Sequence, residues 1–515
     1  MSIRYTIILA VLISLSLCFS AKAETYYIAT NGLDTRTGRG DWTNALLTIS
    51  NAVGKAADND IILVSNGTYV VATNIYVTNG VTLRGENGSS NTMINGNYPV
   101  TTNQCFYIKH TNAVVEGFTI INGHADSGGG VYITDGMLRN CVVSGNVAGV
   151  YGGGIHVGIG AGHVLISNFI IRGNAETNIT TGGGGGINIA KGMIVDSLIE
   201  SNSSTWGGGI RFCYTNILVT NCNINYNTSK GGNGGGFGGG LYFASSDMVT
   251  VTYCRVIGNV VTSVAGSCEG GGIYVGGNGL LIENCDIYDN VITNAINVYG
   301  GGVSMRNSSN VVIRNCTIVN NHGWGSYNVH GGGIYVGSVT NVIRNCLIMS
   351  NWCEGSHASR GGYGGGVYVL SNLYNVIESS TIAGNYAKLD GGGIYFASAG
   401  TDVVYNCIVY FNEITGSVAD NFYFGDNGRK TNMFYICAPD DLSSGVGNIT
   451  SDPQFQDRAS GNYRLKVYSP CVNAGVVCGW MTIAVDLDGR IRIRYGTVDM
   501  GAYEAIYNGT VYGVH

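Results

Sequence analysis

Three polar side chains that could act on one substrate occupy the same position of a repeated motif: His156, Asn188 and Arg211. Each is the second residue of a short apolar segment after a run of glycines, so adjacent strands would place them within ~5 to 10 Å of one another. An imidazole can abstract a proton, an amide can orient a substrate, and a guanidinium can neutralise a carboxylate. As catalytic candidates, these residues would act on a carboxylate-bearing sugar or bind an acidic glycan. Sequence drift on a solvated strand predicts the same residues and is the favoured explanation.

The same position is tyrosine in six further copies of the motif and Ser304 in one. If the copies stack in register, these rings form one row of outward-facing side chains. Flat aromatic faces with hydroxyl groups suit an extended glycan, but tyrosine is also favoured in strands and can stack on itself to stabilise a sheet. The predicted substrate-binding residues are Tyr132, Tyr242, Tyr274, Tyr335, Tyr368 and Tyr395.

The motif that positions these residues recurs ten times between residues 114 and 412. Each copy has Ile or Val three residues before an Asn, then a variable loop, a run of glycines and a short apolar segment, as in Ile318 to Asn321 and Gly331 to Val336. The period of 23 to 33 residues, rich in Val, Ile, Thr, Tyr and Gly, holds two or three short strands and no helical repeat. We therefore predict an all-β solenoid, a single-stranded parallel β-helix in which each copy is one coil.

The repeated Asn is predicted to have a structural role. In stacked coils its amide can bond to turn backbone and to the Asn above and below, which pairs polar groups that burial would otherwise leave unpaired. The predicted ladder consists of Asn146, Asn174, Asn202, Asn227, Asn259, Asn290, Asn321, Asn351, Asn385 and Asn412.

Cysteines recur five residues before the ladder Asn in seven copies, where Phe or Ser stands in the others. Stacked strands lie ~4.8 Å apart, wider than the Cβ separation of a disulfide, so we expect buried free thiols there. Cys471 and Cys478, outside the repeats, are the predicted disulfide candidates.

Composition excludes several classes of function. The 515 residues include 82 Gly and only 4 Pro, without a Gly-X-Y period, which predicts repeated turns and not collagen. Charged residues make up 11% and the net charge is -6, so we expect no nucleic-acid partner. The outward row contains no paired carboxylates of a hydrolase, and no His or Cys group has zinc spacing. We expect no cofactor. Asp486 and Asp488 lie beside a glycine turn and are the one candidate pair for calcium, although a simple turn is the favoured explanation.

The start of the chain predicts export. Residues 1–23 combine Arg4, an apolar stretch from Ile7 to Leu17, and small residues before Glu24, as in a signal peptide. A lipoprotein signal at Cys18 is disfavoured because Leu17 precedes it. No later apolar run reaches the ~20 residues that span a bilayer. We expect a secreted or cell-surface protein, with cell-envelope or outer-membrane association as the alternative.

Regions on either side of the repeats are predicted to close the solenoid. The amphipathic segment from Thr43 to Val53 predicts a helix that caps an open end. The predicted division is residues 1–23 signal peptide, 24–113 N-terminal cap and first coils, 114–412 repeat β-helix, 413–504 terminal coils and C-terminal cap, and 505–515 tail.

The repeats resemble those of the polymorphic outer membrane proteins, within the right-handed parallel β-helix class typified by pectate lyases. Gly331 to Ile334 matches that family's Gly-Gly-Ala-Ile motif, and Ile318 to Asn321 its Phe-x-x-Asn motif. Residues 452–504 resemble the C-terminal region of exported β-helix proteins known as choice-of-anchor Q. The resemblance implies a right-handed coil and export. Only eleven residues follow Glu504, so we expect neither a translocator barrel nor a sorting helix.

These observations favour a non-catalytic, adhesin-like module that binds an extracellular polysaccharide or a cell-surface glycan, as a monomer. The first alternative is a polysaccharide lyase or glycoside hydrolase that acts on acidic polysaccharide along the flank of the β-helix. The second alternative is a structural spacer at the cell surface.

Overall fold

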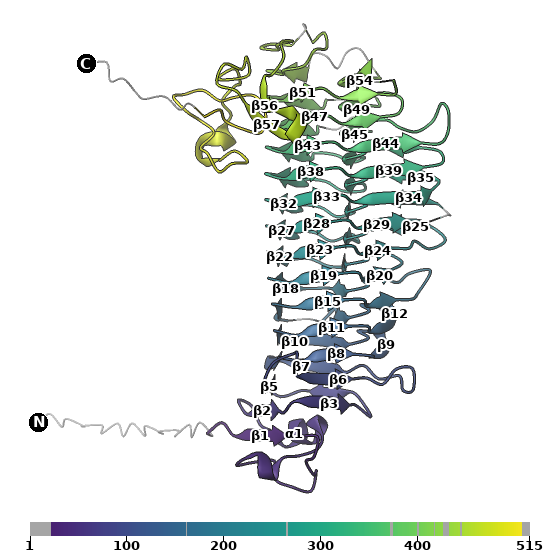
Figure 1. Cartoon of the computed structure of the whole chain (residues 1–515), viewed down its shortest axis with the longest axis vertical. Coiled ribbons are helices and arrows are strands. Elements are labelled where there is room, and N and C mark those ends of the chain that lie inside the picture. Colours follow the sequence, from purple (N-terminus) through teal and green to yellow (C-terminus); the bar gives the residue numbers. More distant parts are fainter. Residues whose placement is uncertain are drawn as a thin grey trace, which may run out of the picture.

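The computed structural model describes residues 22–160, 162–263, 266–370, 374–398, 401–416, 418–425, 432–442 and 445–506. These residues form a column of stacked coils (Figure 1), and the predicted all-β parallel β-helix is confirmed. The predicted signal peptide lies outside the described residues except for its last two positions, as does the predicted tail from residue 507 onward.

One coil contains four short strands. β13 (Ile155–Val157) and β14 (Val164–Ser167) belong to a 26-stranded sheet, β15 (Ile170–Arg172) to a 13-stranded sheet, and β16 (Ala175–Glu176) to a 12-stranded sheet. Each strand pairs in parallel with its equivalent in the next coil. Because side chains alternate across a strand, the inward residues form one continuous apolar core along the column.

Two sets of strands in the large sheet carry the residues discussed below. The first set follows the glycine runs: β10 (Val131–Arg139), β13, β17 (Ile187–Ile189), β21 (Ile210–Phe212), β26 (Leu241–Phe243), β31 (Ile273–Val275), β36 (Val303–Met305), β41 (Ile334–Val336), β45 (Val367–Val369) and β49 (Ile394–Phe396). The second set includes β14, β18 (Gly192–Val195), β22 (Ile217–Thr220), β27 (Thr250–Thr252), β32 (Leu281–Glu283), β37 (Val312–Arg314), β42 (Val342–Arg344), β46 (Val376–Glu378) and β50 (Val403–Tyr405).

The corner after each strand of the second set is a left-handed residue. Asn284, Asn315 and Asn345 have φ of 52°, 53° and 52° there. Asn tolerates this conformation better than other non-glycine residues, which explains its recurrence. Tyr253 occupies the same corner with φ 53°.

The ten repeated Asn side chains form a continuous buried ladder. In each step the backbone N–H and the Nδ2 of one Asn both donate to Oδ1 of the next; from Asn290 to Asn321 these distances are 3.1 and 2.9 Å. The second Nδ2 hydrogen of Asn290 goes to the carbonyl of Val256 at 2.9 Å. Asn421, which lies outside the motif, accepts from Asn412 and extends the ladder by one step.

All described cysteines are free. The expected buried thiols of the repeats are therefore confirmed, and burial raises the pKa of Cys141 and Cys407 to about 12, which makes them unreactive. The predicted disulfide between Cys471 and Cys478 is wrong. Cys471 is buried in an apolar cluster that also contains Cys437, whereas Cys478 begins a short helix.

The N-terminal helix is shorter than predicted. A 3-10 turn, η1 (Trp42–Asn44), is followed by extended chain and then by α1 (Ile49–Lys55). Leu46 is extended because its N–H and C=O bond to the backbone of Tyr27 and Ala29 beside β1 (Thr25–Ile28). The helix buries Ile49, Ala52 and Val53 in the core at the end of the column (Figure 1).

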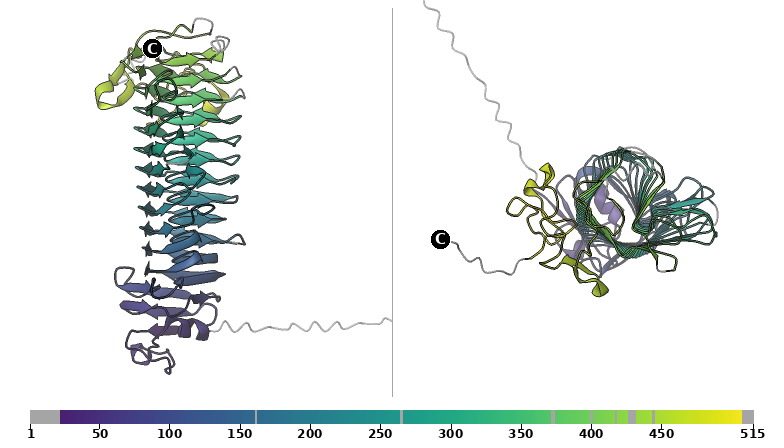
Figure 2. Two further views of the ribbon diagram at one scale, coloured as in Figure 1. Left: turned by 90° about the vertical axis from the view of Figure 1, so that its right-hand side faces the viewer. Right: turned by 90° about the horizontal axis from the view of Figure 1, so that it is seen from above.

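From β9 (His124–Ser127) onward, one side of the coils extends into an arm (Figure 2, right). The outgoing strands form the 12-stranded sheet, which includes β12 (Val147–Tyr151) and β34 (Val291–Ala295). The returning strands form a four-stranded sheet: β25 (Gly235–Phe237), β30 (Ser267–Glu269), β35 (Asn297–Tyr299) and β40 (Val329–His330). A separate apolar cluster between these sheets includes Val261, Ile292 and Val298, so the arm has its own core.

The C-terminal region lies along the side of the column, away from the arm (Figures 1 and 2). β56 (Phe455–Asp457), β57 (Asn462–Leu465) and the 3-10 helix η4 (Gly479–Ile483) belong to it. Its apolar residues cover Leu347, Ala383 and Ile408, which face outward from the 13-stranded sheet. We call residues 452–506 the side cap. In the described part of the chain, no helix has the length and apolarity to cross a membrane.

Candidate functional site

Two rows of side chains face each other across the glycine runs, and we call the region between them the aromatic corner. Successive members of each row lie opposite one another on neighbouring coils, so both rows follow the column axis. Row one contains the residues predicted from the sequence: Tyr132, His156, Asn188, Arg211, Tyr242, Tyr274, Ser304, Tyr335, Tyr368 and Tyr395. Row two contains the residue before the last three glycines of each copy: Ser127, Tyr151, Gly183, Trp206, Phe237, Glu269, Tyr299, His330, Tyr363 and Asp390.

Glycine is required at the turn between the rows. At Gly300, where φ is 72°, an added Cβ would lie 2.1 Å from the carbonyl oxygen of Val303. The tight turn brings each ring of row two against row one. The ring centroids of Tyr299 and Tyr335, for example, are 4.9 Å apart.

This packing buries part of the predicted binding surface. Tyr274, Tyr335 and Tyr368 are only 8%, 2% and 5% exposed, because rings of row two cover them. The expectation that these three rings form an exposed surface is therefore wrong, and their stacking instead stabilises the corner. The partly exposed members of row one are Tyr132, Arg211, Tyr242 and Tyr395, and the rings of row two form the outer face.

The structure brings the three predicted catalytic candidates into direct contact. Nδ2 of Asn188 lies 3.0 Å from Nδ1 of His156, and Nη1 of Arg211 donates to Oδ1 of Asn188 at 2.9 Å. Tyr132 flanks His156, with 4.9 Å between ring centroids. His156 and Asn188 are buried, so the trio is a chain of hydrogen bonds that leads from the interior of the corner to the partly exposed Arg211.

His156 is not arranged as a general base. Because Oδ1 of Asn188 accepts from Arg211, the amide must present Nδ2 as a donor to Nδ1 of His156. That bond occupies the lone pair and leaves the proton of the neutral ring on Nε2. Burial, assisted by the charge of Arg211, lowers the pKa of His156 to about 4, so the ring is neutral at pH 7.

Arg211 reaches the outer face of the corner through the one gap in row two. The gap is Gly183, where an added Cβ would lie 2.4 Å from Cδ of Arg211 and 2.6 Å from the carbonyl oxygen of Trp206. The guanidinium lies 4.9 Å from the centroid of the Tyr151 ring, within cation–π range. The absence of a side chain at Gly183 thus gives a cation a place among the aromatic rings.

Gly183→Ala should displace Arg211. The added methyl group overlaps both the arginine side chain and a backbone carbonyl, so we expect a loss of about 1 to 3 kcal/mol in the free energy of unfolding. Gly160→Ala is the matched control, since nothing lies within 4 Å of its added Cβ. Chemical denaturation of both variants measures the difference. Equal stability of the two variants would contradict the close fit of Arg211 over Gly183.

Glu176 is a buried carboxylate beside the trio that the motif does not reveal. Its Oε2 accepts from the N–H of Thr205 at 3.0 Å, and its Oε1 from the N–H of Asn178. Burial raises its pKa to about 7, although these two bonds and the charge of Arg211 act in the opposite direction. Glu176 holds together the loops that cover the trio, and its carboxylate faces backbone donors.

At Ser304, row one has no aromatic ring, and a polar contact from row two fills the space. Glu269 of row two enters the space that a tyrosine ring would occupy, where Oε2 accepts from Ser304 at 3.2 Å. Nη1 of Arg306 lies 2.5 Å from Oε1 of Glu269 and balances its charge. The guanidinium in turn covers the ring of Tyr299, at 5.0 Å from its centroid.

Row two is the part of the corner that sequence reasoning missed. Its signal was present, because six of its ten members are aromatic or histidine and all stand at a fixed distance before the apolar segment. The preceding loop varies in length between copies, which concealed that the position lies on a strand.

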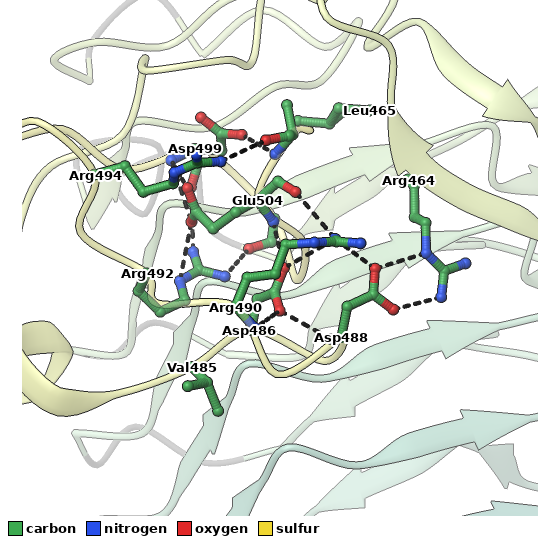
Figure 3. A network of polar contacts seen from close by, with 12 residues as sticks. Arg464, Leu465, Val485, Asp486, Asp488, Arg490, Arg492, Arg494, Asp499 and Glu504 are labelled. Atoms are coloured by element: carbon green, nitrogen blue, oxygen red, sulfur yellow. Dashed lines mark hydrogen bonds and ion pairs between the residues drawn. The ribbon is translucent and has the colours of Figure 1, made fainter. Parts of the chain in front are cut away.

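The predicted calcium ligands are already engaged. Asp488 binds Arg464 and Arg490, and Asp486 accepts from the backbone N–H groups of Asp488 and Arg490 (Figure 3). The turn interpretation therefore describes them better than a calcium site does. Among the residues that the structure describes, no group of three or more His, Cys, Asp or Glu side chains could hold a metal ion.

One family model supports the fold. The family model described as "right handed beta helix region" matches residues 153–363. A search of curated protein sequences finds no match. Similar solved structures include pectate lyase Pel9A, with 14% identity over 94% of this chain and 96% of that chain and a TM-score of 0.32. A PL6 family polysaccharide lyase from Pseudopedobacter saltans has 13% identity over 81% and 94% of the two chains, with a TM-score of 0.41. The A-module of the Azotobacter vinelandii mannuronan C-5 epimerase AlgE4 has 17% identity over 73% and 90%, with a TM-score of 0.33.

Proposed function

We propose that the protein is a secreted or cell-surface β-helix that binds an acidic glycan along the aromatic corner without catalysing a reaction. The observation that carries this proposal is the position of Arg211, which passes over Gly183 and lies against Tyr151 between rings of row two. A partly exposed cation flanked by aromatic faces is suited to a sugar that carries a carboxylate or sulfate group.

Two features favour binding over catalysis. The lone pair of His156 at Nδ1 is engaged by Asn188, so the ring has no free basic nitrogen for proton abstraction. Row one contains no carboxylate, Glu176 and Glu269 face backbone or arginine donors, and Asp390 lies at the opposite end of row two from His156. A lyase or hydrolase that uses the same flank is the alternative, and a structural spacer is the second.

Arg211→Ala should weaken the binding of an acidic polysaccharide. Loss of one charge-assisted contact is worth about 1.5 to 3 kcal/mol, so we expect at least a tenfold increase in Kd, measured by isothermal titration with oligogalacturonate. Arg172→Ala removes the same charge from an exposed position of β15, outside the corner, and should leave Kd unchanged.

Three outcomes would decide between the alternatives. Release of unsaturated or reducing ends by the unaltered protein, abolished in His156→Ala, would overturn the non-catalytic proposal in favour of an enzyme. Failure to bind any acidic or neutral polysaccharide would favour the spacer. Equal Kd for Arg211→Ala and Arg172→Ala would mean that the corner is not the binding surface.

A further inference from the structure

A second candidate site lies on the other side of the column, where the side cap meets the strands of the second set. A cleft of about 370 Å³ opens there beside η4. Arg314 and Arg344 line it from β37 and β42, Tyr253 lies at one end, and Trp480 of the side cap forms a wall. The cleft shares no residue with the aromatic corner.

The two arginines of the cleft are like charges on neighbouring strands, an arrangement that a β-sheet alone does not favour. Arg314 and Arg344 lie directly opposite one another on adjacent parallel strands, where like charges repel. Each pairs with a glutamate on the strand away from the other arginine: Nε of Arg314 lies 2.5 Å from Glu283, which also lines the cleft, and Nε of Arg344 lies 2.5 Å from Glu378. Within the described residues, the terminal amino groups of both arginines have no hydrogen-bond partner, so they are available to an anion.

The carboxylate of Glu378 that pairs with Arg344 is held by two further donors. It is fully buried, and its Oε2 also accepts from Nε1 of Trp480 at 2.8 Å and from the hydroxyl of Tyr405. Trp480 at the same time covers the guanidinium of Arg344, at 4.5 Å from the ring centroid. The side cap thereby fixes Arg344 in place and presents an aromatic ring next to it.

Tyr253 presents an exposed aromatic ring to the cleft. It occupies the left-handed corner that is Asn in the next three coils, and a bulky residue is disfavoured there. Its side chain is also 64% exposed, so no packing in the core explains the choice of tyrosine. Exposed left-handed tyrosines also occur at Tyr226 and Tyr374, so the position of Tyr253 beside the cleft, and not its backbone conformation, makes it a candidate contact.

We propose that this cleft binds one carboxylate-bearing sugar unit of an acidic polysaccharide, with the carboxylate on Arg314 and Arg344 and the sugar ring against Tyr253. Planar guanidinium groups bind carboxylates through paired hydrogen bonds, and few polar groups on an aromatic lining are typical of ligand sites. The inference rests on the proposed function in that the ligand is an acidic glycan, but it uses a different surface.

Tyr253→Asn tests this inference because it should separate affinity from stability. Asn suits the left-handed corner, so the variant should keep or raise the midpoint of thermal unfolding, while Kd for oligogalacturonate rises about tenfold in isothermal titration. Arg314→Gln should raise Kd by a similar factor. Tyr226→Asn is the matched control, since Tyr226 is also exposed and left-handed, with φ 54°, but does not line the cleft.

The outcomes separate the two surfaces. Unchanged Kd in both Tyr253→Asn and Arg314→Gln overturns the cleft, and if Arg211→Ala still weakens binding, the proposed function stands. Loss of binding in the cleft variants alone supports the cleft and overturns the corner. Absence of binding to the unaltered protein overturns both. Tighter binding of a sulfated oligosaccharide, lost in the same variants, would overturn the assignment of the ligand as a carboxylate.

Discussion

Asn290→Ala should reduce the free energy of unfolding by about 4 kcal/mol, one of the two largest effects that we expect from a single substitution. Oδ1 of Asn290 accepts from the backbone N–H and from Nδ2 of Asn259, and its own Nδ2 donates to the carbonyl of Val256. Truncation removes the acceptor of the Asn259 N–H and of one Nδ2 hydrogen of Asn259, whose other hydrogen keeps the carbonyl of Ile224, and it removes the Nδ2 donor of the Val256 carbonyl. Each loss costs about 1 to 3 kcal/mol. Neither side chain nor backbone nearby can replace Oδ1, because each rung already uses its own amide.

Asn223→Ala is the control for this prediction. Asn223 lies on β23 (Asn223–Asn225), in the coil that carries the ladder residue Asn227, but it is exposed. Its loss should change stability by no more than about 0.5 kcal/mol. Urea denaturation followed by circular dichroism measures both variants. A loss below about 1 kcal/mol for Asn290→Ala would mean that solvent enters the ladder and that the amides contribute little.

The ladder also explains why the fold could be predicted from the sequence. A residue that bonds to its own copy in the next coil must recur in register, so the spacing of Asn290, Asn321 and Asn351 records the stacking directly. The extension to Asn421 could not be predicted, because that residue lies only nine positions after Asn412 and reaches the ladder through a different loop.

The candidate site was predicted only in part, for a related reason. Row one could be aligned because it follows the glycine runs at a fixed distance, and His156, Asn188 and Arg211 do lie on adjacent strands. Its burial could not be predicted, since the covering rings come from the returning strands of the arm. Likewise, the sequence gives no sign that Arg492 meets Asn345, 147 residues earlier in the chain, on the flank of the column.

A buried charge network holds the side cap against the column (Figure 3). Arg492 is fully buried, with its Nε 3.2 Å from Glu504 and its Nη1 donating to Asn345 and to the carbonyl of Gly501. Burial raises the pKa of Glu504 to about 8, against the opposing charge of Arg492. The folded cap therefore retains a proton that the unfolded chain loses near pH 4.5, so its stability should fall as the pH rises from about 5 to 8.

Arg492→Ala should detach the side cap from the column, and more so at high pH. Removing one partner of a buried ion pair costs about 3 to 5 kcal/mol, because the remaining carboxylates lose their cation. Without Arg492, the pKa of Glu504 should rise further. The loss of stability caused by the substitution should therefore be smaller at pH 6, where Glu504 is protonated and neutral, than at pH 9. Hydrogen exchange should show lost protection in residues 471–505, while the coils up to residue 340 keep theirs.

The double variant Arg492→Met with Glu504→Gln distinguishes charge from packing. It removes both charges at similar volume, and the glutamine oxygen can still accept from the N–H of Asp499, which now bonds to Glu504 at 3.2 Å. We expect it to recover most of the protection lost in Arg492→Ala and to show a weaker dependence on pH. If the double variant were as poorly protected as the single one, the hydrogen bonds from Arg492 to Asn345 and Gly501, and not the ion pair, would hold the cap to the column.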